Sequence, residues 1–560
     1  MDLLRLFKKK GGYREPAPPT LEPRRRWRLL VPVHRWMHRA EERPGFLIAT
    51  GCLAVGITIP LVAGSAALAL GPVSVLAFAP VVALVYGSLH LYVQRLQPKD
   101  ARRPKNQALL AAVILLVLVL VRLGAGLAES VNFQSPHLPL RSLLFAAPGA
   151  LAGVLLAVLF NARLAFAGSL AVSILATFAV AAQPRFEFFL YTFLGCLAGT
   201  FGMAGQQERT GFFKAGGLVA AANVASLLGF RLLYGFDAAW VFDLAAGLIN
   251  GLVVGVLATG LLPLLEYLFD AATDFRLLEL ANLNQPLLKR LILSAPGTYH
   301  HSIVMGTLAE AAAEAVGANP LLCRVGAYYH DVGKIRKPGY YVENQGGGAS
   351  RHAKLAPHLS SLVVMSHVRE GVELAEAHGL PRAIVDLIPQ HHGTRLLSFF
   401  YQKAREAADP SLEEVPEEAY RYAGPKPQTR EAAILMLADT VEASTRALEE
   451  PTPSRIQGLV QTTINGIFVD GQLDECDLTL RDLHLIAKSF VRVLAGMFHA
   501  RVEYPAAGPE AGRRRDDDGH LGSKPASEDP DRHAIPAKGR RGDARRGGPE
   551  GGRVLAHPDR

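Results

Sequence analysis

The chain has 560 residues and a formal net charge of +9, and half of its residues are hydrophobic. This length exceeds that of one ordinary domain, and a mean hydropathy of +0.19 is high for a soluble protein. The four cysteines form no CxxC pair, so the composition favours neither a zinc ribbon nor a disulfide framework.

Repeated apolar runs between Phe46 and Phe269 are long enough to cross a hydrocarbon core of about 30 Å as helices. We therefore predict a transmembrane domain of about eight helices over residues 46–269. The expected spans are 46–68, 72–94, 108–127, 143–160, 164–182, 190–205, 215–234 and 241–265.

The charges around these runs predict their orientation, because lysine and arginine gather on the cytoplasmic side. Residues 1–45 carry twelve basic and five acidic residues, and Arg95–Gln107 is also basic, so both segments should be cytoplasmic. With an even number of spans, the chain after Phe269 returns to the cytoplasm. A signal peptide is the alternative for the first span, but the long basic leader and the length of the apolar run favour an anchor.

Beyond the membrane region, a linker over residues 270–290 should contain a juxtamembrane helix, because Thr273–Arg290 has apolar residues at helical intervals. Residues 291–505 show an almost wholly helical pattern. We expect Gly317 to close one helix and Asn319 with Pro320 to cap and start the next.

The final segment, residues 506–560, has no aromatic residue and mixes charges with glycine and proline. Such a segment cannot bury enough apolar surface to order itself, so we predict a disordered tail. The predicted fold class is all-α: a basic N-terminal segment, a polytopic transmembrane helical bundle and a cytoplasmic all-helical domain.

Histidines and acidic residues recur in five short motifs of the soluble part. These motifs are GTYHHS (297–302), YYHDVGK (328–334), MSHVREG (365–371), IPQHHGT (388–394) and LADTVEA (437–443). One such histidine is more often a satisfied core residue, but a group with two aspartates favours a first-row divalent metal. Neighbouring residues on a helix diverge by about 100°, so His330 can bind one ion while Asp331 bridges to a second.

The ordered motifs resemble those of the HD-domain metal phosphohydrolases. The strings LLELANLNQPLLKRLILSAPGTYHHS, GAYYHDVGKIRKPGYYVENQ and YRYAGPKPQTREAAILMLADTVEASTRAL further resemble the seven-transmembrane HD family of PgpH-type membrane cyclic di-AMP phosphodiesterases. The resemblance is specific across the HD domain and looser in the membrane region.

The resemblance implies a dinuclear site with seven ligands: His301, His330, Asp331, His367, His391, His392 and Asp439. It assigns His300 to a variable position and implies catalytic roles for Asp331 and Lys334. Lys334 would also contact substrate phosphate, and Asn344 and His352 are further substrate-binding candidates. From the residues alone, Lys334 reads equally well as a surface lysine at a helix end.

Two departures from the family are visible. Only about Gly64 to Gly71 joins the first two spans, where the family carries a large extracellular domain, so we expect that domain to be missing. No GYP motif follows His391 and His392, which argues against the related enzymes that cut cyclic di-GMP.

The resemblance implies hydrolysis of cyclic di-AMP to 5′-pApA by two divalent ions, manganese or iron, at the inner (plasma) membrane with both termini cytoplasmic. Expected partners are the cyclic dinucleotide and membrane lipid, with a homo-oligomer left open and no nucleic acid polymer. Two alternatives remain: an HD hydrolase of guanosine tetraphosphate or cyclic di-GMP, and a non-catalytic membrane nucleotide receptor.

Overall fold

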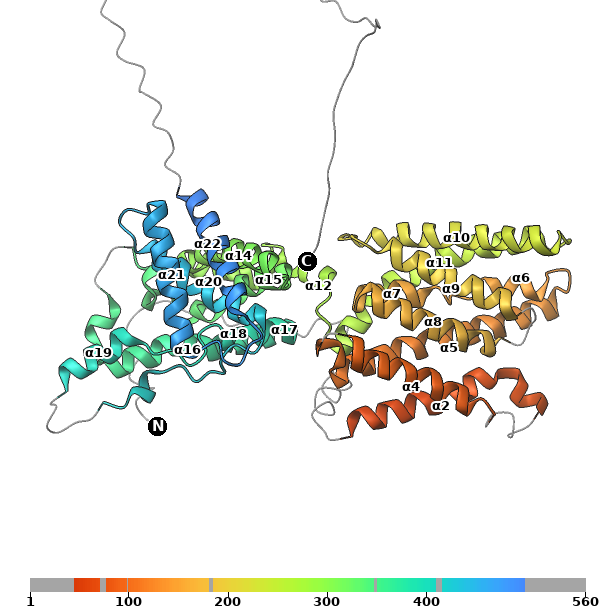
Figure 1. The fold of residues 1–560 in the computed structure, drawn as a ribbon, viewed down its shortest axis with the longest axis horizontal. Helices are drawn as coiled ribbons and strands as arrows, with labels where there is room; N and C mark the ends of the chain where they lie inside the picture. The colour runs from red at the N-terminus through yellow and green to blue at the C-terminus, as the bar shows by residue number, and fades with distance from the viewer. Residues whose placement is uncertain are drawn as a thin grey trace, which may run out of the picture. The chain divides into compact units, whose positions relative to one another are not determined.

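A computed structural model describes residues 45–70, 77–97, 99–180, 185–346, 350–408 and 415–498. Within these ranges the chain forms helices joined by short turns, and the sheet-like pairing is limited to one isolated bridge between Leu396 and Arg421 (Figure 1). The predicted all-α fold class is therefore confirmed. The predicted N-terminal segment (apart from Gly45) and the predicted disordered tail lie outside the described residues.

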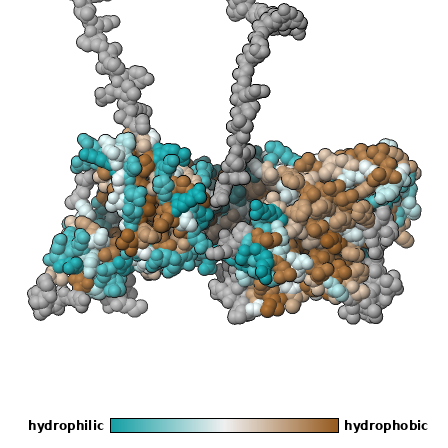
Figure 2. Space-filling view, in the orientation of Figure 1, coloured by the Kyte–Doolittle hydropathy of each residue, from teal (hydrophilic) through white to brown (hydrophobic). Residues whose placement is uncertain are grey.

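The membrane region is a set of apolar helices whose side chains give it a largely hydrophobic surface (Figure 2). Its helices are α2 (Phe46–Leu70), α4 (Ala79–Leu96), α5 (Pro104–Gln134), α6 (Leu140–Phe145), α7 (Leu151–Leu159), α8 (Ala162–Ala179), α9 (Arg185–Gly202), α10 (Gly211–Tyr234) and α11 (Trp240–Phe269). By length and composition, five helices of the described residues can cross a membrane: α2, α5, α8, α10 and α11. A shorter apolar helix covers Phe186–Gly202. The count of eight spans stays a prediction.

The span expected over residues 143–160 is not one helix, because the chain breaks between α6 and α7. The break contains Pro148, which cannot donate a backbone hydrogen bond. Two side chains satisfy carbonyl groups at the break: Tyr191 donates to Phe145 O at 2.6 Å, and Asn250 donates to Phe145 O at 3.1 Å and Ala147 O at 2.6 Å. A break inside an apolar region is tolerated when such partners replace the missing helix bonds.

Helices α10 and α11 approach each other closely through glycines. A Cβ atom at Gly216 would lie 2.6 Å from the carbonyl oxygen of Gly251, and one at Gly251 would overlap the carbonyl oxygen of Gly216. Small residues allow helix backbones to pack this closely in apolar surroundings. A larger side chain at either position would therefore force the two helices apart.

A buried ion-pair cluster joins α6, the last turn of α10 and the first turn of α11. Asp243 is fully buried and accepts hydrogen bonds from Arg231 at 2.6 Å, Ser142 at 2.5 Å and Arg141 at 3.2 Å. Removing one member of such a cluster leaves a buried charge without its partner, which is costly in free energy.

The linker expected as one juxtamembrane helix forms two helices, so that expectation is wrong in detail. Helix α12 spans Asp274–Ala281 and α13 spans Pro286–Ser294. Thr273 caps α12 by accepting from the amide of Arg276, and Pro286 starts α13 because proline fits the first helical position. The proline that restarts the chain is thus the physical reason for the break.

The remaining described residues form a compact helical domain. Its longer helices are α14 (Pro296–Val316), α15 (Pro320–Tyr329), α16 (Pro357–Ala377), α19 (Ser398–Ala407), α20 (Arg430–Arg446), α21 (Pro453–Val469) and α22 (Leu480–Met497), and its one-turn helices α17 (Arg382–Val385) and α18 (Leu387–Gln390) follow α16. Between α15 and α16 the described residues form four 3-10 turns: η4 (Val332–Arg336), η5 (Pro338–Tyr340), η6 (Val342–Asn344) and η7 (Arg351–Lys354). A fifth, η8 (Glu417–Tyr420), precedes α20.

The predicted punctuation between α14 and α15 is confirmed. Gly317 follows the last residue of α14 with φ +67°, a left-handed conformation that glycine adopts without strain. The side chain of Asn319 accepts from the amide of Leu322, and Pro320 is the first residue of α15.

Two apolar cores hold this domain together. One is shared by α14, α15, α20, α21 and α22 and includes Met305, Leu437 and Phe490, and the other joins α12, α13, α15 and α16 around Leu277 and Tyr329. Helix α15 contributes to both cores. His330 and Asp331, which follow the C-terminal end of α15, are therefore held in place by both cores.

Candidate metal centre

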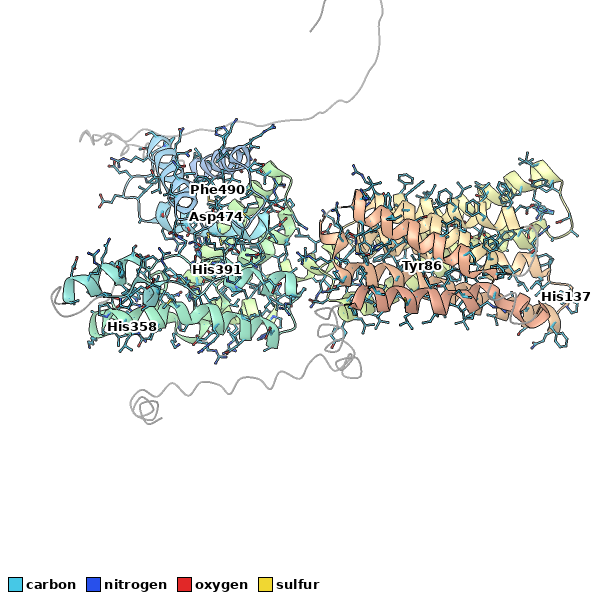
Figure 3. The ribbon with its side chains drawn as sticks, turned by 60° about the horizontal axis from the view of Figure 1, so that its bottom comes forward. Tyr86, His137, His358, His391, Asp474 and Phe490 are labelled. Atoms are coloured by element: carbon cyan, nitrogen blue, oxygen red, sulfur yellow. The ribbon has the colours of Figure 1, made fainter. Side chains whose placement is uncertain are left out.

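The structure brings the seven predicted metal ligands together from five places in the helical domain. His301 lies in the second turn of α14, and His330 and Asp331 follow α15 directly. His367 lies on α16 and Asp439 on α20. His391 and His392 follow the short helix α18, and Figure 3 shows His391 in the interior of the domain. Whether these side chains bind metal stays a prediction.

One half of the cluster is formed by His301, His330, Asp439 and one oxygen of Asp331. The Nε2 atom of His301 lies 3.0 Å from Asp439 Oδ1 and 4.0 Å from Asp331 Oδ2. The Nε2 atom of His330 lies 3.3 Å from Asp331 Oδ2 and 3.6 Å from Asp439 Oδ1. His330 has no exposed surface and Asp331 only 1%. These four donors therefore face one small buried volume.

The other half faces the second oxygen of Asp331. Asp331 Oδ1 lies 3.3 Å from His367 Nε2 and 3.9 Å from His391 Nε2. His367, His391 and His392 present ligand atoms that all lie within 4.8 Å of one another, and the same holds for His301, His330 and Asp331. The two carboxylate oxygens of Asp331 are thus divided between two groups of imidazoles.

Three of the histidines are oriented by their own helical turns. The Nδ1 atoms of His330, His367 and His391 donate to the carbonyl oxygens of Ala327, Val364 and Ile388, at 2.7, 2.6 and 2.5 Å. Each acceptor lies three residues earlier in the chain. Because Nδ1 carries the proton in this arrangement, the lone pair of the neutral ring is on Nε2, the atom that faces the cluster.

The protein surroundings favour the protonation states in which His367, His391 and Asp331 can bind a metal ion. Burial lowers the pKa of His367, and burial together with His330 lowers the pKa of His391 to about 3. Burial opposes ionisation of Asp331, but Lys334 and His330 outweigh it and hold the carboxyl pKa well below its usual value. His367 and His391 therefore offer neutral imidazoles beside an ionised carboxylate, a donor set that divalent metals bind.

The remaining imidazoles next to the carboxylates behave differently. Burial alone would lower the pKa of His330, but Asp331 and Asp439 raise it to about 10. Burial also opposes the charged form of His301, while hydrogen bonds to Asp439 and Glu442 raise its pKa. Two carboxylates in this half of the cluster thus attract positive charge, which either a proton or a metal ion can supply.

Several polar atoms in the cluster fit a bound cation. Among the residues that the structure describes, His330 Nε2 and Asp331 Oδ1 are buried and have no hydrogen-bond partner. The Nε2 atoms of His367 and His391 lie 3.5 Å apart, so two lone pairs face each other. Two imidazole nitrogens that share an ion at about 2.1 Å would lie at a similar separation. The donor set and its spacing therefore fit divalent metal.

Lys334 reaches into the centre from η4. Its Nζ atom lies 2.6 Å from Asp331 Oδ2 and 2.9 Å from Glu343 Oε1, and it lies 5.0 Å from the ring centroid of Tyr341. Burial opposes its charge, but Asp331 and Glu343 raise the pKa of Lys334 well above its usual value. Lys334 is therefore a buried, charged group beside the predicted metal ligands, unlike a surface lysine.

The other substrate candidates have local partners. The amide of Asn344 accepts from the backbone amides of Gly297 and Thr298 and donates to Thr298 Oγ1, so it caps the start of α14. His352 Nε2 donates to Tyr340 O at 2.9 Å, and the ring packs beside Phe400. His300, which the resemblance left out, is exposed. The substrate roles of Asn344 and His352 stay predictions.

Sequence reasoning missed three residues that shape the centre. Glu442 accepts from His301 Nδ1 at 2.5 Å, and Tyr422 stacks on His392 with ring centroids 4.3 Å apart. A side chain at Gly333 would overlap the carbonyl oxygen of His367, so only glycine allows η4 to approach α16 this closely. A signal for Glu442 was present, because it lies three residues after Asp439 on one helix face.

Comparisons with known proteins agree with the two-part organisation. Residues 72–273 match the family described as 7TM receptor with intracellular HD hydrolase, and residues 298–444 match the HD domain family. The first match begins after α2 and ends just before α12. The helical domain that holds the candidate metal centre thus contains the HD region.

Two curated relatives cover most of the chain. Cyclic-di-AMP phosphodiesterase PgpH of Bacillus subtilis (strain 168) is 38% identical over 436 residues, which are 76% of this chain and 59% of the relative. The Listeria monocytogenes protein of the same name is 35% identical over 433 residues, 76% of this chain and 58% of the relative. The chain thus spans about three fifths of the length of these relatives.

A crystal structure of the L. monocytogenes PgpH HD domain in complex with cyclic di-AMP is 45% identical. It covers 39% of this chain and 100% of the solved chain, with a TM-score of 0.37. The chain therefore carries a membrane region that matches the seven-transmembrane HD receptor family over residues 72–273 and an HD domain over residues 298–444.

Proposed function

We propose that this protein is a membrane-bound, metal-dependent phosphodiesterase that hydrolyses cyclic di-AMP to 5′-pApA. The observation that carries the proposal is the position of Asp331, whose two oxygens face two separate groups of imidazoles. A carboxylate in this position suits a pair of ions that share one ligand. The names of the two relatives, both cyclic-di-AMP phosphodiesterases, support the substrate.

The proposed ligands divide between two ions. His301, His330 and Asp439 would hold one ion, His367, His391 and His392 the other, and Asp331 both. When bound, two divalent ions supply an activated water and neutralise the charge of a phosphodiester during in-line attack. The imidazole and carboxylate donors suit manganese or iron, and we propose one of these metals.

The residues of the chain would then bind and orient the substrate. Lys334 holds a fixed positive charge beside Asp331, where it can contact a non-bridging phosphate oxygen. Glu343 and Tyr341 restrain the ammonium group, so its position is set before substrate arrives. The bond that breaks joins phosphorus to the ribose 3′ oxygen, and the 5′ phosphate stays on the product.

The same proposal places the protein in the inner (plasma) membrane, with the HD domain and both termini in the cytoplasm. Basic segments before the first span and around Arg95–Gln107 support this orientation. Lipid would surround the apolar helices α2, α5, α8, α10 and α11. A homo-oligomer is compatible with this arrangement, and we propose no role for a nucleic acid polymer.

The test is hydrolysis by the purified full chain in detergent with Mn²⁺. We expect cyclic di-AMP to be cut at least about tenfold faster in kcat/KM than cyclic di-GMP, a transition-state preference of about 1.4 kcal/mol. Chromatography should detect 5′-pApA as the first product, and a chelator should stop its formation.

Two results would overturn the substrate assignment. One is comparable kcat/KM for the two cyclic dinucleotides. The other is faster release of pyrophosphate from guanosine tetraphosphate than cleavage of either cyclic dinucleotide. Both results would leave the proposed metal ligands in place.

A further inference from the structure

His301 differs from the other oriented histidines in how its ring is held. The Nδ1 atoms of His330, His367 and His391 donate to backbone carbonyls of their own helical turns. His301 Nδ1 instead donates to Glu442 at 2.5 Å, a side chain 141 residues away in the sequence. The orientation of His301 therefore depends on a side chain that mutation can remove.

Glu442 is built into this position. Its side chain is buried, and its second oxygen accepts from Arg446 one helical turn later. Asp439 lies one turn earlier on the same helix, and its Oδ1 atom is 3.0 Å from the other nitrogen of His301. Helix α20 thus contacts both nitrogens of one imidazole, Nε2 through Asp439 and Nδ1 through Glu442.

We propose that Glu442 is a positioning residue that fixes the ring orientation and tautomer of His301 and thereby sets the metal affinity of one half of the centre. A carboxylate that accepts from the distal nitrogen leaves the lone pair on the nitrogen that faces the ion and increases its basicity. The hydrogen-bond partners described for Glu442 are His301 and Arg446, both outside the His367, His391 and His392 group. Its effect should therefore be confined to one ion.

This inference rests on the proposed metal centre, so its test measures metal binding separately from turnover. The full chain, purified in detergent and stripped with a chelator, is titrated with Mn²⁺, and bound ions are followed by calorimetry and electron paramagnetic resonance. Removal of a carboxylate that supports a ligand typically weakens metal affinity by about 10- to 100-fold.

We expect Glu442→Gln, which keeps an acceptor oxygen but loses the charge, to weaken one of the two Mn²⁺ ions by about 10-fold. Glu442→Ala, which loses both, should weaken the same ion by about 100-fold. The second ion should stay within about threefold of the unmodified protein, and the spectral signal of coupled ions should decrease in the same order.

Glu431→Gln is the matched control, because Glu431 lies on the same helix and accepts from the backbone amide of Asn319 at 3.0 Å, outside the metal centre. This variant should bind both ions normally. Two normal affinities in Glu442→Gln and Glu442→Ala, or an equal loss of both ions that Glu431→Gln shares, would overturn the role of Glu442. Failure of the unmodified chain to bind Mn²⁺ would overturn the metal centre itself.

Discussion

Replacement of Asp331 by alanine should abolish turnover while leaving the helical fold in place. In the structure this carboxylate lies 3.3 Å from both His330 Nε2 and His367 Nε2, through different oxygens. Its removal would take one ligand from each proposed ion at once. We therefore expect each ion to bind at least about 100-fold more weakly, a loss of about 2.7 kcal/mol per ion.

The effect on catalysis should be larger than the effect on folding. A loss of at least about 1,000-fold in kcat corresponds to about 4 kcal/mol of transition-state stabilisation, which a two-ion clamp can supply. Lys334 would keep Glu343 as a partner at 2.9 Å, so the buried ammonium would not be left alone. Helical content measured by circular dichroism should therefore remain close to that of the unmodified protein.

Metal analysis, turnover of cyclic di-AMP and circular dichroism would be measured on Asp331→Ala and on Asp474→Ala. Asp474 is an exposed aspartate of the same domain, and its only described ion pair is with Lys426 at 3.5 Å (Figure 3). The control should bind two ions and turn over normally. Two ions per chain together with normal turnover in Asp331→Ala would refute the bridging role.

Three further predictions concern the membrane region. Reporter fusions should report the outside at Ser135 and the cytoplasm at Arg103, Lys214 and Ala272, and a cytoplasmic signal at Ser135 would contradict the eight-span topology. Insertion of one to three alanines into α12 should change turnover if the membrane helices regulate the HD domain, since each residue rotates a helix by about 100°; equal turnover in all insertions would favour a plain anchor. Asp243→Ala should lower stability by about 3–5 kcal/mol, because Arg231 loses a buried partner; an unchanged thermal midpoint in detergent would contradict this estimate.

Much of the centre could be predicted because its residues lie in short motifs. His330 with Asp331 and His391 with His392 can be recognised directly in the sequence as pairs of adjacent residues. The family resemblance predicted that each of these four residues is a metal ligand. Residue types alone could not separate His300 from His301, since this requires knowing which face of α14 is buried. The resemblance supplied that choice, and the structure places His301 inside and His300 outside.

Other features depended on tertiary contacts and could not be read in advance. The sequence offers Asn344 as a substrate-binding candidate, but it could not show that the side-chain amide bonds to Thr298 at the start of α14, 46 residues earlier in the chain. Glu442 reaches His301 only because α20 packs against α14, and the sequence does not show that contact. By contrast, Pro148 and Pro286 are visible in the sequence as residues that interrupt helices. The prediction of one continuous helix across each of them underestimated this effect of proline.

The carbonyl acceptors three residues before His330, His367 and His391 bear on how this centre tolerates evolutionary change. A backbone oxygen is supplied by every amino acid, so substitutions at Ala327, Val364 and Ile388 that keep the local turn also keep the acceptor. Sequence drift around these three histidines should therefore leave their rings correctly oriented. Unlike these three, His301 depends on the identity of a distant side chain, so relatives that lose a carboxylate at the position of Glu442 should be ones whose metal requirement has changed.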